Sequence, residues 1–192
     1  LSRGLGDVYK RQVHNCAVGA YAMFTNTGGD YNTAVGGQAM YYTTTGQYNT
    51  GIGYDALQDN TTGSSNTAIG YQTLDVSTTT SNNTAIGAQA LHANTTGYNN
   101  ASVGAFSLLS NTTGNFNTAL GKDALAANTT ASNNTAVGHD ALTTNTTGDY
   151  CTAVGSSALA ANTTATYNVA VGYEALNDNT TGQYNTCLLY TS

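Results

Sequence analysis

Acidic side chains that recur at one position of a repeat are the residues best suited to chemistry. Asp55, Asp123, Asp140 and Glu174 each stand two residues after a recurring glycine, and Asp123 and Asp140 are 17 residues apart. If consecutive repeats stack at the strand spacing, these two carboxylates lie about 5 Å apart. Such a pair can raise one pKa or hold a cation, whereas two solvated acids beside Lys122 do neither. We expect the solvated arrangement, with no catalytic, cofactor-binding or metal-binding residues.

Tyrosines form a second candidate group. Tyr54, Tyr71 and Tyr173 each directly follow a recurring glycine, and exposed rings at such positions can stack on sugars. We therefore predict these three residues as surface glycan contacts. Ring packing between adjacent repeats is the more frequent use of aromatic residues at such spacing. None of the three histidines has metal-ligand spacing, and the chain contains no Ser/His/Asp order and no phosphate-binding loop.

The element that must position these side chains is a strict 17-residue repeat, typified by Asn83-Thr84-Ala85-Ile86-Gly87. The repeat glycines are Gly19, Gly36, Gly53, Gly70, Gly87, Gly104, Gly121, Gly138, Gly155 and Gly172, without insertion or deletion. So regular a period is typical of a solenoid or fibre, in which each repeat is one structural unit stacked on the next. Stacked repeats also bring equivalent residues together in rows along the stack, which we call ranks. The Asn and Thr ranks are expected to hydrogen-bond from coil to coil.

Two aliphatic ranks are predicted to face the core. One lies directly before the repeat glycine, as Ile86 does, and the other lies four residues after it, as Leu91 does. Alanine fills most positions two residues before and three residues after the glycine. Such small side chains allow close packing, either against the opposite wall of the same coil or against another chain. The second alanine rank includes Ala56, Ala90, Ala124, Ala141 and Ala158.

Local propensities suggest one strand and two corners in each repeat. Thr-Ala-Val/Ile holds a β-branched residue between turn formers and is the best strand candidate. The repeat glycine permits a positive φ or a tight corner, and Asn-Thr-Thr-Gly suits a second corner. The stretch Gly-x-x-Ala-Leu fits either a second strand or a short helical turn. We predict an all-β chain, a parallel β-solenoid of ten 17-residue coils over residues 13–186.

The two ends do not fit the repeat. Residues 1–12 and 187–192 resemble translated sequencing-adapter read-through, as seen at the ends of environmental gene fragments, and we expect both to be non-native or disordered tails. Divergent terminal capping repeats are the alternative. Residues 13–186 contain one basic residue, Lys122, and nine acidic ones, so their net charge is +1 − 9 = −8. This charge argues against a nucleic-acid partner, and no apolar run is long enough to span a membrane.

The motif Asn-Thr-Ala-(Val/Ile)-Gly-x-x-Ala-Leu resembles YadA-type head repeats of trimeric autotransporter adhesins, and similar Asn-Thr-Thr-Gly-rich arrays occur in phage tail-fibre-like proteins. The resemblance covers about residues 13–186, although the period of 17 is longer than the usual unit of that family. It implies a left-handed β-roll, three chains side by side, and a role in surface attachment.

These observations together predict a structural or adhesive segment of an extracellular fibre, on a bacterial surface or a phage virion. The expected partners are two further copies in a homotrimer, and a host-surface protein or glycan. Two aliphatic side chains per coil bury little surface against the entropy of ordering a coil, which also favours a partner surface. An ice-binding solenoid, suggested by the Thr rank from Thr27 to Thr180, is the alternative function. A glycan-active β-helix enzyme that uses Asp123 and Asp140 is the third.

Overall fold

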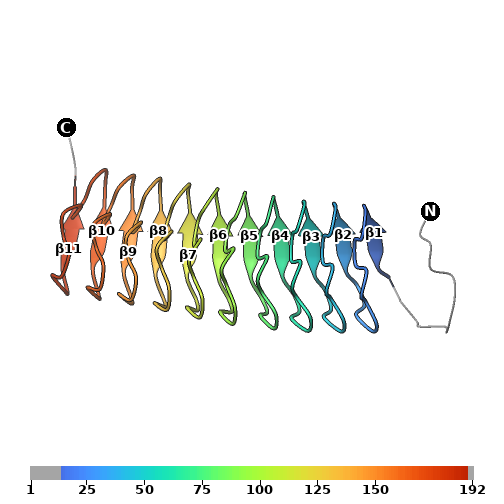
Figure 1. Ribbon diagram of the computed structural model, residues 1–192. Helices are drawn as coiled ribbons and strands as arrows, with labels where there is room; N and C mark the ends of the chain where they lie inside the picture. Colours follow the sequence, from blue (N-terminus) through green and yellow to red (C-terminus); the bar gives the residue numbers. More distant parts are fainter. Residues whose placement is uncertain (1–13, 190–192) are drawn as a thin grey trace, which may run out of the picture.

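The chain forms a parallel β-solenoid in the computed structural model, which describes residues 14–189 (Figure 1). Its strands are β1 (Cys16–Val18), β2 (Thr33–Val35), β3 (Thr50–Ile52), β4 (Thr67–Ile69), β5 (Thr84–Ile86), β6 (Ala101–Val103), β7 (Thr118–Leu120), β8 (Thr135–Val137), β9 (Thr152–Val154), β10 (Val169–Val171) and β11 (Thr186–Leu188). They form one 11-stranded sheet in sequence order, and every pair is parallel. The predicted all-β solenoid is therefore confirmed.

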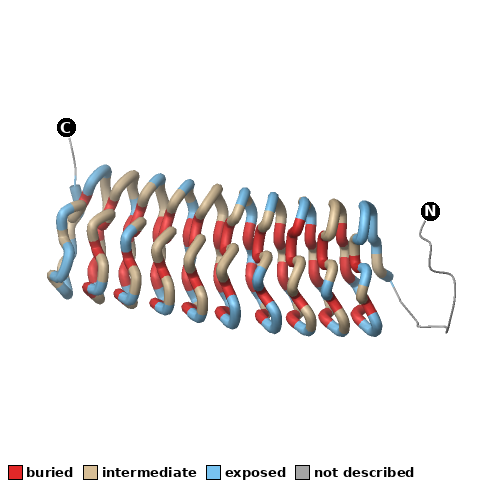
Figure 2. The backbone as a smooth tube through the Cα atoms, in the orientation of Figure 1, coloured by how far each residue is buried: buried red, intermediate tan, exposed pale blue. Residues whose placement is uncertain are grey.

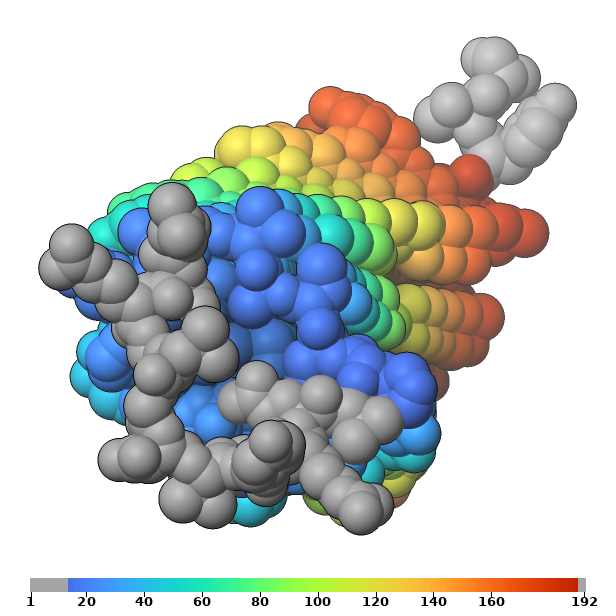
Figure 3. All heavy atoms as spheres, turned by 90° about the vertical axis from the view of Figure 1, so that its right-hand side faces the viewer, coloured from blue at the N-terminus to red at the C-terminus, as the bar shows by residue number. Residues whose placement is uncertain are grey.

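Each strand pairs with the next in strict register. Between β5 and β6 the partners are Thr84↔Ala101, Ala85↔Ser102 and Ile86↔Val103, so every partner lies one repeat further along the chain. Ten such steps at the strand spacing span about 48 Å. Seen toward the N-terminal end, rows of atoms run from the first coils to the last, as expected of a rod whose coils repeat one cross-section (Figure 3).

Only one of the two predicted aliphatic ranks lies in the core. Leu91 and its equivalents four residues after the repeat glycine are buried, as expected. The aliphatic residue before the glycine points outward instead, and Ile86 is 37% exposed while Leu120 is 48% exposed. The prediction that this rank faces inward was wrong. The middle residue of each strand, such as Ala85, is the one that faces the core, and buried residues recur at the same places in each coil (Figure 2).

Strand geometry explains the reversal. Side chains alternate between the two faces of a strand, so Thr84 and Ile86 share one face and Ala85 takes the other. The interior of the coil is narrow and accepts alanine. We call the solvent-facing residues of the strands the outer sheet face. Its aliphatic rank is Val18, Val35, Ile52, Ile69, Ile86, Val103, Leu120, Val137, Val154, Val171 and Leu188. Its threonine rank is Thr33, Thr50, Thr67, Thr84, Thr118, Thr135, Thr152 and Thr186, with Cys16, Ala101 and Val169 at the same position.

The second alanine rank also lies inside the coil. Ala56, Ala90, Ala124, Ala141 and Ala158 are fully buried within the single chain. They belong to the same core cluster as the strand alanines and the leucines. Of the two arrangements that the sequence allowed, close packing against the opposite wall is therefore the one found. This rank offers no surface to another chain.

Departures from alanine in the core are matched by compensating residues. Gly51 replaces a strand alanine, and a Cβ there would lie 2.8 Å from Cγ of Met40, which is bulkier than the usual leucine. Ser102 replaces another alanine, and its hydroxyl donates to the carbonyl of Ser107 at 2.9 Å. Thr73 donates its hydroxyl to the carbonyl of Gly87 at 2.8 Å. A close-packed interior requires such compensation because a single added atom displaces its neighbours.

The stretch after the repeat glycine is a turn, neither a second strand nor a helix. Gly87 has a φ of +129°, and a Cβ there would lie 2.6 Å from the carbonyl carbon of Gly104 in the next coil. The positive φ expected at the repeat glycine is thus confirmed, and the close stacking of coils excludes any side chain. Gln89 and Leu91 follow in the left-handed region, with φ of 54° and 55°. Side chains rarely adopt this conformation, so the surrounding coil must impose it.

Two buried asparagine ladders join the coils. In the first, Oδ1 of Asn83 accepts the backbone N–H of Asn100 at 2.9 Å, and its Nδ2 donates to the carbonyl of Gly97 at 3.0 Å. Both partners belong to the following coil. In the second, Nδ2 of Asn128 donates to Oδ1 of Asn111 at 2.8 Å and to the carbonyl of Ala131 at 3.1 Å. The predicted asparagine ladders are confirmed.

Cys151 stands at a position of the first ladder that asparagine otherwise fills. Its backbone N–H donates to Oδ1 of Asn134 at 2.8 Å, and its thiol donates to the carbonyl of Ala165 at 3.3 Å. Burial raises the pKa of this thiol, which keeps it protonated as a donor. The thiol is a weaker donor than an asparagine amide, but its hydrogen bonds keep the geometry of the ladder.

A different set of threonines, the corner rank from Thr27 to Thr180, forms a ladder of a different kind. The hydroxyl of Thr129 donates to the carbonyl of Thr146 at 3.1 Å, and that of Thr146 donates to the carbonyl of Thr163 at 3.0 Å. The hydroxyls therefore satisfy backbone acceptors of the next coil and do not bond to one another. The threonine bonds fix the coil length because each of them joins equivalent corners of adjacent coils.

The regular stack continues past the expected boundary at residue 186. In β11, Cys187 pairs with Ala170 and Leu188 pairs with Val171. Parallel backbone pairing does not require a particular side chain, and Leu188 is aliphatic like the rest of its rank. Residues 187 and 188 therefore belong to the last coil. Residues 1–13 and 190–192 lie outside the described residues.

The first asparagine ladder gives a prediction about stability. Asn117→Ala removes two hydrogen bonds, from the backbone N–H of Asn134 at 3.0 Å and to the carbonyl of Ala131 at 2.8 Å. Because both groups then stay buried without these partners, the free energy of unfolding should fall by about 2–5 kcal/mol. Chemical denaturation measures the change. Thr130→Ala, at an exposed corner, is the control and should change it by less than about 0.5 kcal/mol. Equal effects of the two substitutions would contradict the role assigned to the ladder.

Candidate functional site

The acids at the second position after the glycine are brought together as expected. Oxygen atoms of Asp123 and Asp140 and a ring nitrogen of His139 all lie within 4.8 Å of one another. Lys122 Nζ forms an ion pair with Asp123, and Nδ1 of His139 lies 3.0 Å from Oδ2 of Asp140. All four side chains are partly exposed. The arrangement is an ion-pair cluster on the surface, in which Lys122 already compensates one carboxylate.

A second acidic cluster was not anticipated from the sequence. Asp75 lies beside His92 of the next coil, with 3.8 Å between Oδ2 and Nδ1, and its Oδ1 is buried without a hydrogen-bond partner. The pKa of Asp75 is raised to about 6, mainly by burial and also by the charges of Asp55 and Asp59, while His92 opposes the shift. Asp55 is itself buried, and Nε2 of Gln58 donates to its Oδ1 at 3.0 Å. The signal available in the sequence was the spacing of Asp75 and His92, which equals one repeat.

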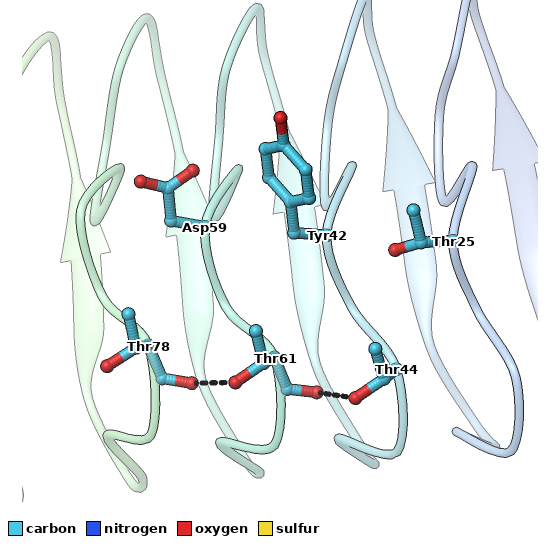
Figure 4. A pocket seen from close by; sticks show the side chains of 6 residues that line it. All are labelled: Thr25, Tyr42, Thr44, Asp59, Thr61 and Thr78. Carbon is cyan, nitrogen blue, oxygen red and sulfur yellow. Dashed lines mark hydrogen bonds between the residues drawn. The ribbon is translucent and has the colours of Figure 1, made fainter.

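An open groove of about 360 Å³ lies next to this cluster, lined by Thr25, Tyr42, Thr44, Asp59, Thr61 and Thr78 (Figure 4). The hydroxyl of Thr44 donates to the carbonyl of Thr61 at 3.0 Å, and that of Thr61 donates to Thr78 at 2.9 Å. These hydroxyls are therefore committed to the ladder. Burial raises the pKa of Asp59, the only carboxylate in the lining. The groove offers few polar groups with which to orient a ligand.

Two of the three predicted glycan contacts pack against each other. The rings of Tyr54 and Tyr71 are stacked with centroids 6.1 Å apart, and Nε2 of Gln38 donates to the hydroxyl of Tyr54 at 3.1 Å. Cross-coil ring packing, the alternative weighed for these residues, is thus what the structure shows. A sugar needs an open ring face, so the shared face of this pair is lost to it. Tyr173 is 64% exposed, and a hydrogen bond with Glu174 raises the pKa of its hydroxyl.

Other aromatic residues form columns along the rod. Tyr150 stacks on Tyr167 with centroids 5.0 Å apart, and Tyr167 stacks on Tyr184 at 5.1 Å. Near the N-terminal end Tyr31 stacks on Tyr48 at 5.0 Å. These columns lie five residues before the repeat glycine, at positions with positive φ. They stabilise the contact between coils, and at the N-terminal end His14 extends the column by stacking on Tyr31 with centroids 4.8 Å apart.

Comparison with known proteins gives no relative for this chain: no protein-family model, curated protein or solved structure matches it. Over residues 14–189 the chain has no helix long and apolar enough to cross a bilayer. The function must therefore be argued from the geometry of the rod and from the groups on its surface.

The buried carboxylate of Asp75 predicts a pH dependence of stability. Its pKa is about 6 in the folded chain and about 3.9 in an unfolded one. Between these values the folded chain binds more protons at Asp75 than the unfolded chain does, so protonation of Asp75 favours the folded state. This contribution to the free energy of unfolding is complete below about pH 4 and is lost as the pH rises through 6. Asp55 and Asp59, whose pKa values are also raised, act in the same direction. Asp75→Asn should remove part of this slope and stabilise the chain at pH 7 by about 2 kcal/mol.

Denaturant unfolding at half-unit steps from pH 4 to pH 7 measures this slope. Asp178→Asn serves as the control because Asp178 is an exposed acid in a later coil, one position further along the repeat than Asp75. An unchanged slope in Asp75→Asn would show that the carboxylate is not buried as described.

Proposed function

We propose that this chain is a passive structural segment of an extracellular fibre, carried on a bacterial surface or a phage virion. The observation that supports the proposal best is the uninterrupted register of eleven strands, which makes the chain a straight rod. Coil-to-coil bonds are made by buried asparagines, by the backbone and by the corner threonines, so the other surface positions are free to vary. Such a rod projects or presents whatever is attached to its ends.

The surface chemistry agrees with a passive role. The acidic cluster around Asp123 is neutralised in part by Lys122, and in the groove beside Asp59 the hydroxyls of Thr44 and Thr61 are engaged in the ladder. Tyr173 keeps an exposed ring and is therefore the residue best placed to contact a host glycan. Turnover of a glycan that is lost in Asp123→Asn and Asp140→Asn would favour the enzyme function instead.

A rigid spacer makes a quantitative prediction about distances. Spin labels on Thr45→Cys and Thr164→Cys, at equivalent exposed corners seven coils apart, should give one narrow distance near 34 Å. The pair Thr45→Cys and Thr113→Cys, four coils apart, should give about 19 Å. Pulsed electron paramagnetic resonance measures both, with Cys16 and Cys187 replaced by serine and labelled protein diluted into unlabelled protein. Broad distributions, or distances that do not scale with the number of coils, would overturn the rigid-spacer function.

Ice binding remains the second candidate because of the outer sheet face. The hydroxyls of the Thr27–Thr180 rank, which first suggested this function, are largely engaged by backbone carbonyls. The strands, however, present threonine and an aliphatic residue on alternate positions, as Thr84 and Ile86 show. These groups form a regular grid of about 4.8 Å by 6.7 Å, and such grids can order water.

A thermal-hysteresis measurement on the full chain separates the two functions. We expect no activity above that of a non-binding protein. In the outer sheet face, Ala101 and Val169 interrupt the threonine rank, and Leu120 is bulkier than its neighbours in the aliphatic rank. Clear activity that is lost in Thr84→Lys but retained in the corner variant Thr96→Lys would make ice binding the main function.

A further inference from the structure

The open groove in the N-terminal part of the rod lies between two ranks of the solenoid. Its upper row in Figure 4 is formed by residues six positions after a repeat glycine: Thr25, Tyr42 and Asp59. Its lower row is formed by residues eight positions after one: Thr44, Thr61 and Thr78. The residue between the rows is buried in each of these coils, as Asn60 is, so the two rows flank the groove. Its volume of about 360 Å³ is within the range of sites for small molecules.

The lower row turns methyl groups toward the groove. The hydroxyls of Thr44 and Thr61 donate to carbonyls of the next coil at 3.0 and 2.9 Å, which directs both hydroxyls along the rod. Their methyl carbons therefore lie on the side that faces Tyr42 and Asp59 (Figure 4). Methyl groups stacked at the strand spacing form an apolar strip, along which an extended apolar chain can lie.

Aromatic rings gather at the N-terminal end of the groove. Tyr42 packs edge to face on Tyr41 with centroids 4.6 Å apart, and Tyr41 stacks on Phe24 at 5.3 Å. The rings of Tyr42 and Phe24 are exposed. All three stand five or six residues after a repeat glycine, where the coils that follow Gly121 and Gly155 carry only alanine. The rings are therefore a local addition that the stack of coils does not require.

The carboxylate in the groove has no compensating base. Asp59 is near enough to Asp75 for its negative charge to raise the pKa of that carboxyl. The ion pairs of the described residues include none with Asp59, and Lys122, the one lysine or arginine among those residues, pairs with Asp123 instead. Burial raises the pKa of Asp59, and no neighbouring cation opposes the shift. The groove thus combines an unpaired carboxylate, an exposed aromatic ring and an apolar strip.

We propose that this groove binds a small organic cation with an extended apolar chain, of the alkylammonium class, whose ammonium group lies between Tyr42 and Asp59. The ammonium group donates hydrogen bonds to the carboxylate, and the negative face of the tyrosine ring attracts its charge. The alkyl chain lies along the threonine methyl groups of the lower row and loses contact with water there. The site goes beyond the spacer function and does not depend on it.

Isothermal titration calorimetry of the full chain with octylammonium chloride at pH 7 tests this site. We expect one ion bound per chain, with an affinity that falls about two- to fourfold for each methylene group removed in the hexyl and butyl homologues. Octanol and octanoate should bind at least about tenfold more weakly, because neither carries a positive charge for Asp59. Equal binding of octanol and octylammonium, or equal binding of butylammonium and octylammonium, would overturn the proposal.

Substitutions locate the bound ion, with circular dichroism to verify folding. Asp59→Asn keeps the shape of the side chain and removes its charge, so the affinity should fall about tenfold or more. Tyr42→Leu keeps the apolar bulk without the ring, so the affinity should fall about threefold. The matched control is Asp178→Asn, because Asp178 occupies the same position in a later coil as Asp59 does, with Ala161 at the position of Tyr42. This control should bind as the wild type does.

Two outcomes would show that the groove is not a specific site. Undiminished binding by folded Asp59→Asn would overturn it directly. Several ions bound per chain, with equal losses in Asp59→Asn and Asp178→Asn, would show a general attraction to the acidic rod and would overturn it as well. The spin-label distances do not involve the groove, so either outcome leaves the rigid-spacer function as it stands.

Discussion

The structure depends on asparagine side chains that join each coil to the next. An asparagine amide carries one acceptor oxygen and two donor hydrogens, which lets a single side chain bond in two directions. Asn83 uses both, accepting from the backbone of Asn100 and donating to the carbonyl of Gly97. Because the partners sit at fixed places in the neighbouring coil, one inserted residue would break every bond of that coil. This constraint accounts for the absence of insertions across the repeats.

The narrow interior follows from the same constraint. Each coil has room for two small residues, one leucine and two asparagines, and close stacking at the repeat glycine leaves no space for a side chain there. Exceptions are therefore paired, as Gly51 is with Met40 and Ser102 is with Ser107. The second aliphatic residue of the coil is left on the outside. An exposed aliphatic rank is thus a consequence of how the interior is filled.

The ionisable side chains that could take part in binding or catalysis lie toward the surface of the rod and differ from coil to coil. Asp123, Asp140 and His139 meet on one side of the rod, while Asp75 and His92 meet in an earlier part of it. Since the ladders hold the coils without help from these side chains, substitution at the surface does not disturb the stack. A scaffold of this kind separates the part that supports from the part that can vary, which suits a fibre whose surface meets different partners.

Much of the architecture was determined by the sequence by itself. The period, the repeat glycines, the asparagine and threonine ranks and the buried leucines predict an all-β solenoid, because in-register stacking brings identical residues together. The proximity of Asp123 and Asp140 also follows from their spacing of one repeat. The boundary at residue 186 was less secure, since backbone pairing extends wherever the chain can stay extended.

The orientation of the strands was decided by the tertiary structure. Alternation makes Thr84 and Ile86 share a face, but composition alone favoured placing the aliphatic residue inward. The buried Asn83, two residues before Ala85, settles the matter, since residues two apart point the same way along a strand. The surroundings of Asp75 were likewise not predictable from the sequence, because its pKa depends on burial and on two carboxylates of the preceding coil. A linear pattern records which residues are equivalent, whereas the space available inside the coil decides which of them are enclosed.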